Sequence, residues 1–177
     1  MNLIETFQDL VAQVPELIQP LIVALAGAVP FIEGEGAAAI GIIGGIHPVV
    51  AAIAAIVGNF ACVAVLVLAS SGARKAIVDR TRTRQLAGAD GAVVVEEAPV
   101  DDRRAARRQK FQRAFERYGV PGVSLLGPLL LPTHFTATML AASGIGKGRI
   151  LLWQAVAIIG WTTAITLIVG GAVSVIH

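Results

Sequence analysis

The chain has 177 residues, of which 55% are hydrophobic and 15% are charged, and its mean hydropathy is +0.75. About a quarter of the residues in a soluble domain are charged, so this composition excludes an ordinary soluble domain and predicts an integral membrane protein. The lone Cys62 excludes a disulfide framework and a cysteine-based metal site, and we interpret it as a small buried hydrophobe.

The formal net charge of +2 hides a strong asymmetry along the chain. Residues 1–70 contain no lysine or arginine, whereas residues 71–118 contain twelve of the fourteen cationic side chains. The other two are Lys147 and Arg149. The lack of positive charge near the N-terminus argues against a secretory signal peptide, which needs a basic first segment.

Residues 2–13 place apolar side chains at helical spacing opposite polar ones, which predicts a short amphipathic helix at the membrane interface. A charged break follows at Pro30-Phe-Ile-Glu-Gly-Glu-Gly36, between two uncharged apolar arms. Each arm is shorter than the roughly 20 residues that cross a bilayer. Proline ends a helix, and we expect Gly34 and Gly36 to permit a tight reversal. We therefore predict a re-entrant helical hairpin over residues 17–46, with Glu33 and Glu35 at its tip. A polar loop between two full spans, with solvated glutamates, is the alternative.

Residues 49–69 form a continuous apolar run in which Asn59 is the one strongly polar member, which predicts a transmembrane helix. Residues 71–118 form a basic linker with an aperiodic stretch at 88–99 and a basic amphipathic helix from Asp101 to Tyr118. Such a helix beside a membrane is typical of contact with anionic headgroups, and a role in nucleic-acid binding is not expected.

The same order of features returns in residues 119–177. A short apolar arm, the break Pro132-Thr-His-Phe-Thr136, a second short arm and a glycine turn at 144–149 lead to a long apolar span at 150–176. When Pro30 is aligned with Pro132, Gly44 meets Gly146 and the two long spans come into register. We therefore predict an all-α membrane protein built from an inverted repeat of two units, 1–70 and 119–177. Each unit is a re-entrant hairpin (17–46 and 119–143) followed by one transmembrane helix. Hairpins at matching positions in two halves are typical of transporters.

In this topology every lysine and arginine lies on one side of the membrane. The positive-inside rule then places residues 71–118 and 144–149 in the cytoplasm and both termini outside. Two full spans in place of each hairpin give the same sides.

Several motifs resemble the small multidrug export proteins, distant relatives of the DedA (VTT-type) membrane proteins. They are Pro-x-x-Glu-x-x-Gly-Ala from Pro30, Gly58-Asn59, Arg117-Tyr-Gly119, Gly127-Pro128, Leu131-Pro132 and Ala141-x-x-Gly144. The resemblance implies two facing hairpins near the midplane of a bacterial cytoplasmic membrane. It also implies drug export or, as in the DedA relatives, translocation of phospholipid or polyprenyl phosphate. Glu33 matches the acid of the first hairpin and Gly36 the glycine after it. Glu35 stands where the family often has arginine, and His134 is nearest to an arginine of the DedA relatives.

Glu33 and Glu35 would repel each other in a low-dielectric cleft, so at least one would hold a proton near neutral pH. A carrier can exchange that proton for a cationic or amphipathic substrate. Alternatively, both carboxylates cap a helix that begins near Gly36. His134 could relay a proton or pair with Glu33, or it could be a polar turn residue. Asn59 and Gln154 are expected to bond across helices.

The function that these residues favour is a proton-coupled carrier, not an enzyme, with no cofactor. The alternatives are a lipid or polyprenyl-phosphate flippase and a membrane scaffold that recruits a partner through its basic helix. Arg117, Lys147 and Arg149 would contact lipid headgroups at the cytoplasmic rim. A zinc site built from His47, His134 and the glutamates lacks motif spacing. We expect a homodimer, with small side chains such as Ala51, Ala54, Ala55 and Gly58 at helix contacts.

Overall fold

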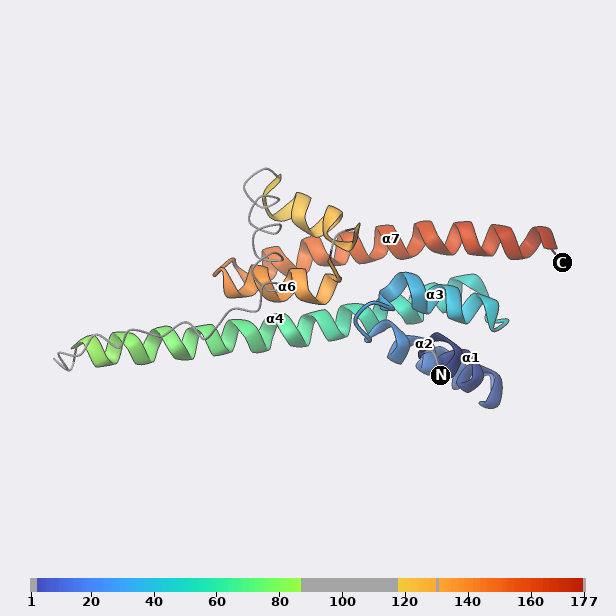
Figure 1. Cartoon of the computed structure of the whole chain (residues 1–177), viewed down its shortest axis with the longest axis horizontal. Coiled ribbons are helices and arrows are strands. Elements are labelled where there is room, and N and C mark those ends of the chain that lie inside the picture. Colours follow the sequence, from blue (N-terminus) through green and yellow to red (C-terminus); the bar gives the residue numbers. More distant parts are fainter. Residues whose placement is uncertain (1–2, 87–117, 130, 177) are drawn as a thin grey trace.

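The computed structural model describes residues 3–86, 118–129 and 131–176, which form helices joined by short turns, with no strand among them (Figure 1). The all-α prediction is confirmed for this part of the chain. The aperiodic linker and most of the predicted basic helix lie outside the described residues.

Two helices are long and apolar enough to cross a membrane, α4 (Pro48–Leu86) and α7 (Lys147–Ile176). They pack against each other and run in opposite directions (Figure 1). Both occur where the apolar runs predict them. However, α4 does not end near residue 70, because the basic segment that follows is rich in alanine, arginine and lysine, which are good helix formers.

Each long helix buries a single stripe of side chains spaced four residues apart. On α4 the stripe comprises Ala51, Ala55, Asn59, Val63 and Val67. On α7 it comprises Ile150, Gln154, Ile158, Thr162 and Thr166, with Ala157 buried beside it. The other faces expose large aliphatic side chains, as expected of helices in contact with lipid.

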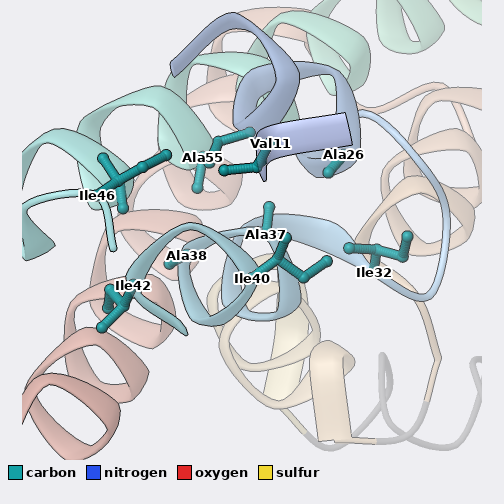
Figure 2. Close-up of a cluster of buried hydrophobic side chains, with 11 residues drawn as sticks. Val11, Ala26, Ile32, Ala37, Ala38, Ile40, Ile42, Ile46 and Ala55 are labelled. Carbon is teal, nitrogen blue, oxygen red and sulfur yellow. The ribbon is translucent and has the colours of Figure 1, made fainter. Parts of the chain in front are cut away.

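The first short helices, α1 (Leu3–Gln13), α2 (Gln19–Gly27) and α3 (Glu33–Ile43), pack together beside the N-terminal half of α4 and the C-terminal half of α7. Val11, Ala37, Ile40 and Ala55 meet in the core of this group (Figure 2).

Small residues bring α2 and α4 into backbone contact. A Cβ at Gly58 would overlap the Ala24 carbonyl, and one at Gly27 would lie 2.8 Å from the Ala55 carbonyl oxygen. The predicted small-residue face is therefore used within the chain: Ala51 and Ala55 are buried here, and Gly58 contacts α2. These small residues therefore lie at helix contacts, as expected, and within one copy the contacts are with α2 and α3.

The second group comprises helical residues 118–126, the 3₁₀ turn η1 (Gly127–Leu129) and α6 (Thr133–Ala142). It packs beside the C-terminal half of the apolar part of α4 and the N-terminal half of α7. Val63, Val67, Val123, Leu140 and Ile150 are among its core residues.

Helices α3 and α6 end in turns of the same kind. Gly45 (φ 88°) and Gly144 (φ 85°) adopt the left-handed conformation that favours glycine. The following residues, Ile46 and Ile145, donate their N–H groups back to the carbonyls of Gly41 (2.9 Å) and Leu140 (3.4 Å). The structure thus pairs Gly45 with Gly144, whereas the sequence alignment pairs Gly44 with Gly146.

Candidate functional site

The break between α2 and α3 owes its shape to residues other than glycine. Phe31 (φ 75°) and Glu33 (φ 53°) have positive φ, which costs a non-glycine residue about 1–2 kcal/mol. The expectation that Gly34 and Gly36 make the reversal is wrong, since both lie inside α3 and neither has positive φ. Pro30 lies in the break itself. Strained non-glycine backbone is typical of functional sites, where the surrounding structure holds it in place.

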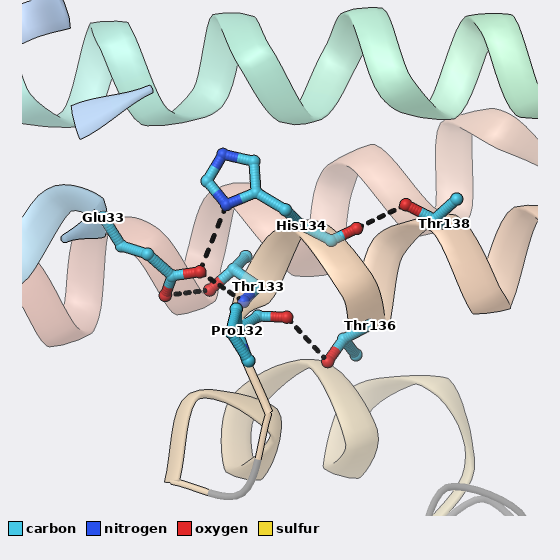
Figure 3. Close-up of polar contacts among 6 residues, drawn as sticks. All are labelled: Glu33, Pro132, Thr133, His134, Thr136 and Thr138. Carbon is cyan, nitrogen blue, oxygen red and sulfur yellow. Dashed lines mark hydrogen bonds and ion pairs between the residues drawn. The ribbon is translucent and has the colours of Figure 1, made fainter. Parts of the chain in front are cut away.

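Glu33 is buried and its carboxylate contacts the first turn of α6 (Figure 3). Its Oε1 accepts the Thr133 backbone N–H at 2.5 Å, and its Oε2 accepts the Thr133 hydroxyl at 2.8 Å. His134 Nδ1 lies 3.2 Å from Oε1. Ile32 is the N-cap residue of α3, and no side chain caps that helix end. Both glutamates lie in the first turn of α3, as the capping alternative expects, but the Glu33 carboxylate also binds Thr133 across the two breaks.

His134 is also buried, and its ring extends from α6 toward α4 (Figure 3). Nδ1 faces Glu33, while Nε2 is buried with no hydrogen-bond partner among the described residues. The sequence left open whether His134 pairs with Glu33, and the structure places them in contact. Pro132 has an extended backbone (ψ 139°) that turns the chain into α6 and aims the first two α6 side chains at Glu33.

Gly34 places this junction beside the middle of the apolar run of α4 and the middle of α7. A Cβ at Gly34 would overlap the Thr162 hydroxyl and lie 3.4 Å from Asn59 Nδ2. Asn59 lies near the centre of the apolar run 49–69 of α4, and Thr162 near the centre of the run 150–176. The glycine is needed for this close approach. The Glu33 contact therefore lies at the level of the middle of the apolar run of α4 and near the midpoint of α7.

Further polar side chains are buried along the α4–α7 seam. Asn59, Gln154 and Thr162 are fully buried, and their side-chain polar atoms have no hydrogen-bond partner in the described part of the chain. The expectation that Asn59 and Gln154 bond across helices is therefore wrong for this conformation. A buried amide without a partner costs about 1–3 kcal/mol, so such groups are rare outside functional regions.

A pocket of about 280 Å³ opens beside the junction. It is lined by Phe31, Ile32, Glu33, Glu35 and Gly36, by Pro128 and Leu129 of η1, and by Trp161 and Ile165 of α7. Trp161 Nε1 donates to the Leu125 carbonyl at 2.8 Å, which fixes the indole between α7 and residues 118–126. The pocket is thus shared by both broken segments and one long helix.

The threonines of the second break have two roles. Thr136 and Thr138 donate their hydroxyl groups to the carbonyls of Pro132 and His134, four residues earlier in the chain. Thr133 instead binds the Glu33 carboxylate, a role that its sequence context does not reveal. Phe31 and Trp161 were not predicted to contribute to the site, because no local pattern distinguishes them from other apolar residues.

The remaining candidate residues lie at the ends of the bundle. Lys147 and Arg149 are exposed in the first turn of α7, while Arg117 lies outside the described residues. The Arg74 guanidinium of α4 lies over the turn at Gly144, so these cations share one end. His47 accepts the Val49 N–H through Nδ1 (3.3 Å), which fits a structural role. The described residues contain no cluster of three potential metal ligands.

Chemically, the junction joins a buried carboxylate to an imidazole and places both beside a pocket that contains a second carboxylate. Such an arrangement can bind a proton or a small cation in a low-dielectric environment. No protein-family model, no curated protein and no solved structure matches the chain.

Proposed function

We propose that the protein is a transporter of the small multidrug export type, moving amphipathic or cationic compounds across a bacterial cytoplasmic membrane with proton coupling. The contact between Glu33 and the Thr133–His134 turn carries this proposal. It joins two broken helical segments, and it lies level with the middle of the apolar run of α4 and the middle of α7. Ionisable residues at that depth are costly, and they mark transport pathways and proton relays.

The arrangement of the short helices supports two re-entrant hairpins. Helices α2, α3 and α6 have 9, 11 and 10 residues, too few to cross a bilayer that needs about 20. One group of short helices lies beside the first half of the apolar run of α4 and the other beside its second half, and the two breaks meet at Glu33. We propose that they enter from opposite sides as an inverted repeat, with backbone breaks tolerated because they are enclosed by protein.

Charge supports the orientation. Arg74 lies against Gly144, near Lys147 and Arg149, whereas Gly170 near the end of α7 lies against Pro48 at the start of α4. The cationic end would face the cytoplasm by the positive-inside rule, and both termini would lie outside. A single chain of two long helices encloses little space, so we propose a homodimer.

Protonation of Glu33 would couple to movement of the hairpins. As a carboxylate, Glu33 receives two hydrogen bonds from Thr133, and bonds to a charged acceptor are roughly twice as strong as neutral ones. A proton on Glu33 weakens these bonds and removes the attraction to a charged His134. The hairpin tips can then separate, so that proton binding favours one conformation over the other.

The flippase alternative is less well supported by the site. A phosphate headgroup needs positive charge at depth, and the described interior offers His134 alone against two glutamates. The cations of the described residues lie at one end of the bundle, where they could recruit a headgroup but not accompany it across the membrane.

The proposal is tested with purified protein in proteoliposomes that contain an internal pH dye, with candidate cations added in turn. We expect a substrate-dependent proton flux that Glu33→Gln abolishes and Glu16→Gln, a matched change at an exposed site, leaves intact. Glutamine preserves the shape of the side chain but cannot exchange a proton. Glu33-sensitive scrambling of labelled polyprenyl phosphate without proton flux would favour the flippase. Wild-type protein inactive in both assays, with intact folding, would refute transport and favour the scaffold.

A further inference from the structure

The pocket beside the junction contains a carboxylate that the Glu33 contact does not use. Glu35 lies one residue beyond Gly34 in the first turn of α3 and lines the pocket wall. No lysine, arginine or histidine is among the lining residues. Among the described residues, Glu35 forms no ion pair with a cationic side chain.

The rest of the pocket wall is apolar and aromatic. The Trp161 indole is held in place by its bond to the Leu125 carbonyl, and Ile165, Pro128 and Leu129 lie around it. The Phe31 ring forms a tilted contact with Phe135 across the two breaks, with ring centroids 6.2 Å apart. An aromatic face attracts a cation that comes within about 6 Å of the ring centre.

The mouth of the pocket faces the outside of the bundle. Phe31 is 73% exposed and Leu129 is 63% exposed, and both line the pocket. Because this mouth lies at the level of the middle of the apolar run of α4 and the middle of α7, its surroundings in a membrane would be acyl chains. A ligand that enters there has an apolar body.

We propose that this pocket is a binding site for a small organic monocation, an ammonium ion with an apolar or aromatic body. Glu35 pairs with the positive charge, Trp161 and Phe31 provide the aromatic faces, and Ile165 and Leu129 contact the apolar body. The inference rests on the proposed transport function for its purpose, but the binding itself does not require transport. In this proposal the two glutamates have different roles. Glu33 joins the hairpins and exchanges the proton, while Glu35 binds the positive charge of the substrate.

The volume of about 280 Å³ fits a small molecule, near the lower end of the roughly 300–1,000 Å³ typical of ligand pockets. The two carboxylates disfavour anions, and the described lining residues include no cation that would bind a phosphate. A dication would need Glu33 as well, which Thr133 and His134 already occupy.

Trp161 allows binding to be measured without transport. The chain has two tryptophans, and Trp153→Phe leaves Trp161 as the sole indole reporter. The full-length variant in lipid nanodiscs is titrated with benzyltrimethylammonium, whose charge is permanent. Neopentylbenzene, in which carbon replaces the nitrogen, is the uncharged probe. We expect a saturable fluorescence change with the cation and an affinity for the neutral analogue that is weaker by about tenfold or more, a difference of about 1.4 kcal/mol.

Three variants in the same single-tryptophan background distinguish an effect of the Glu35 charge on binding from an effect on the structure of the pocket. Glu35→Gln is expected to weaken binding of the cation by about tenfold or more, while Glu35→Asp retains most of it and Glu16→Gln retains all of it. No saturable signal in the folded single-tryptophan protein would overturn the proposal. So would equal affinities for the two probes, or binding unaffected by Glu35→Gln. Glu33-dependent flux without any Trp161 response overturns this pocket alone, whereas binding without flux supports the pocket and removes the transport proposal.

Discussion

The bond between Glu33 and the Thr133 hydroxyl gives the most direct energetic test of the hairpin contact. Thr133→Val removes the 2.8 Å bond to Oε2 and nearly preserves the volume of the side chain. A hydrogen bond to a charged group contributes about 1.5–3 kcal/mol, so we expect the free energy of unfolding to fall by that amount. Thr133→Ser keeps the hydroxyl and is the matched control.

Thr133→Val should lower the free energy of unfolding by less when residue 33 is neutral. In a Glu33→Gln background the hydroxyl can rotate and accept from the new amide, which gives a neutral bond that contributes about 0.5–1.5 kcal/mol. The double-mutant cycle should therefore show a coupling energy of about 1 kcal/mol. Unfolding in mixed micelles with rising dodecyl sulfate, followed by tryptophan fluorescence, measures each variant. A coupling below about 0.5 kcal/mol, the level at which unconnected sites add, would refute a charge-assisted contact between the hairpins.

Three further predictions concern packing and topology. Gly34→Ala should lower the free energy of unfolding by about 1–3 kcal/mol, because the added Cβ overlaps the Thr162 hydroxyl. In the same assay, adding Thr162→Ala should restore most of that loss. Gly58→Ala should also cost about 1–3 kcal/mol, and no side-chain change can relieve it because its Cβ meets the α2 backbone. In a cysteine-free background, an impermeant thiol reagent added to intact cells should label His47→Cys but not Gly146→Cys, which should react only in opened cells.

Gly160→Ala is the common packing control, since nothing lies within 4 Å of its Cβ position. We expect no loss there, and a gain of up to about 1 kcal/mol, because alanine favours a helix more than glycine does. A loss at Gly160 as large as that at Gly34 would show that the loss does not depend on the contact with Thr162. Labelling of Gly146→Cys in intact cells would reverse the proposed orientation.

The residue pattern was sufficient to predict the elements. Long apolar runs predict α4 and α7, and prolines with polar neighbours predict the breaks before α3 and α6, because span length and helix interruption are local properties. The local pattern failed at the end of α4, where a change in polarity at residue 70 suggested a boundary. The helix continues there because alanine, arginine and lysine favour a helix in water as well as in an apolar environment.

The site itself depends on the tertiary structure. The sequence identifies Glu33, Glu35 and His134 as unusual in an apolar chain, but the Thr133 bonds and the contact between Gly34 and Thr162 join residues about 100 positions or more apart. Only the antiparallel packing of α4 and α7, which brings the two breaks to one level, decides that Glu33 meets α6 while Glu35 turns into a pocket. The hydropathy of the sequence indicates which residues are buried away from water, but it does not specify which buried residues contact each other. That outcome follows from how the glycine and alanine surfaces let the helices approach.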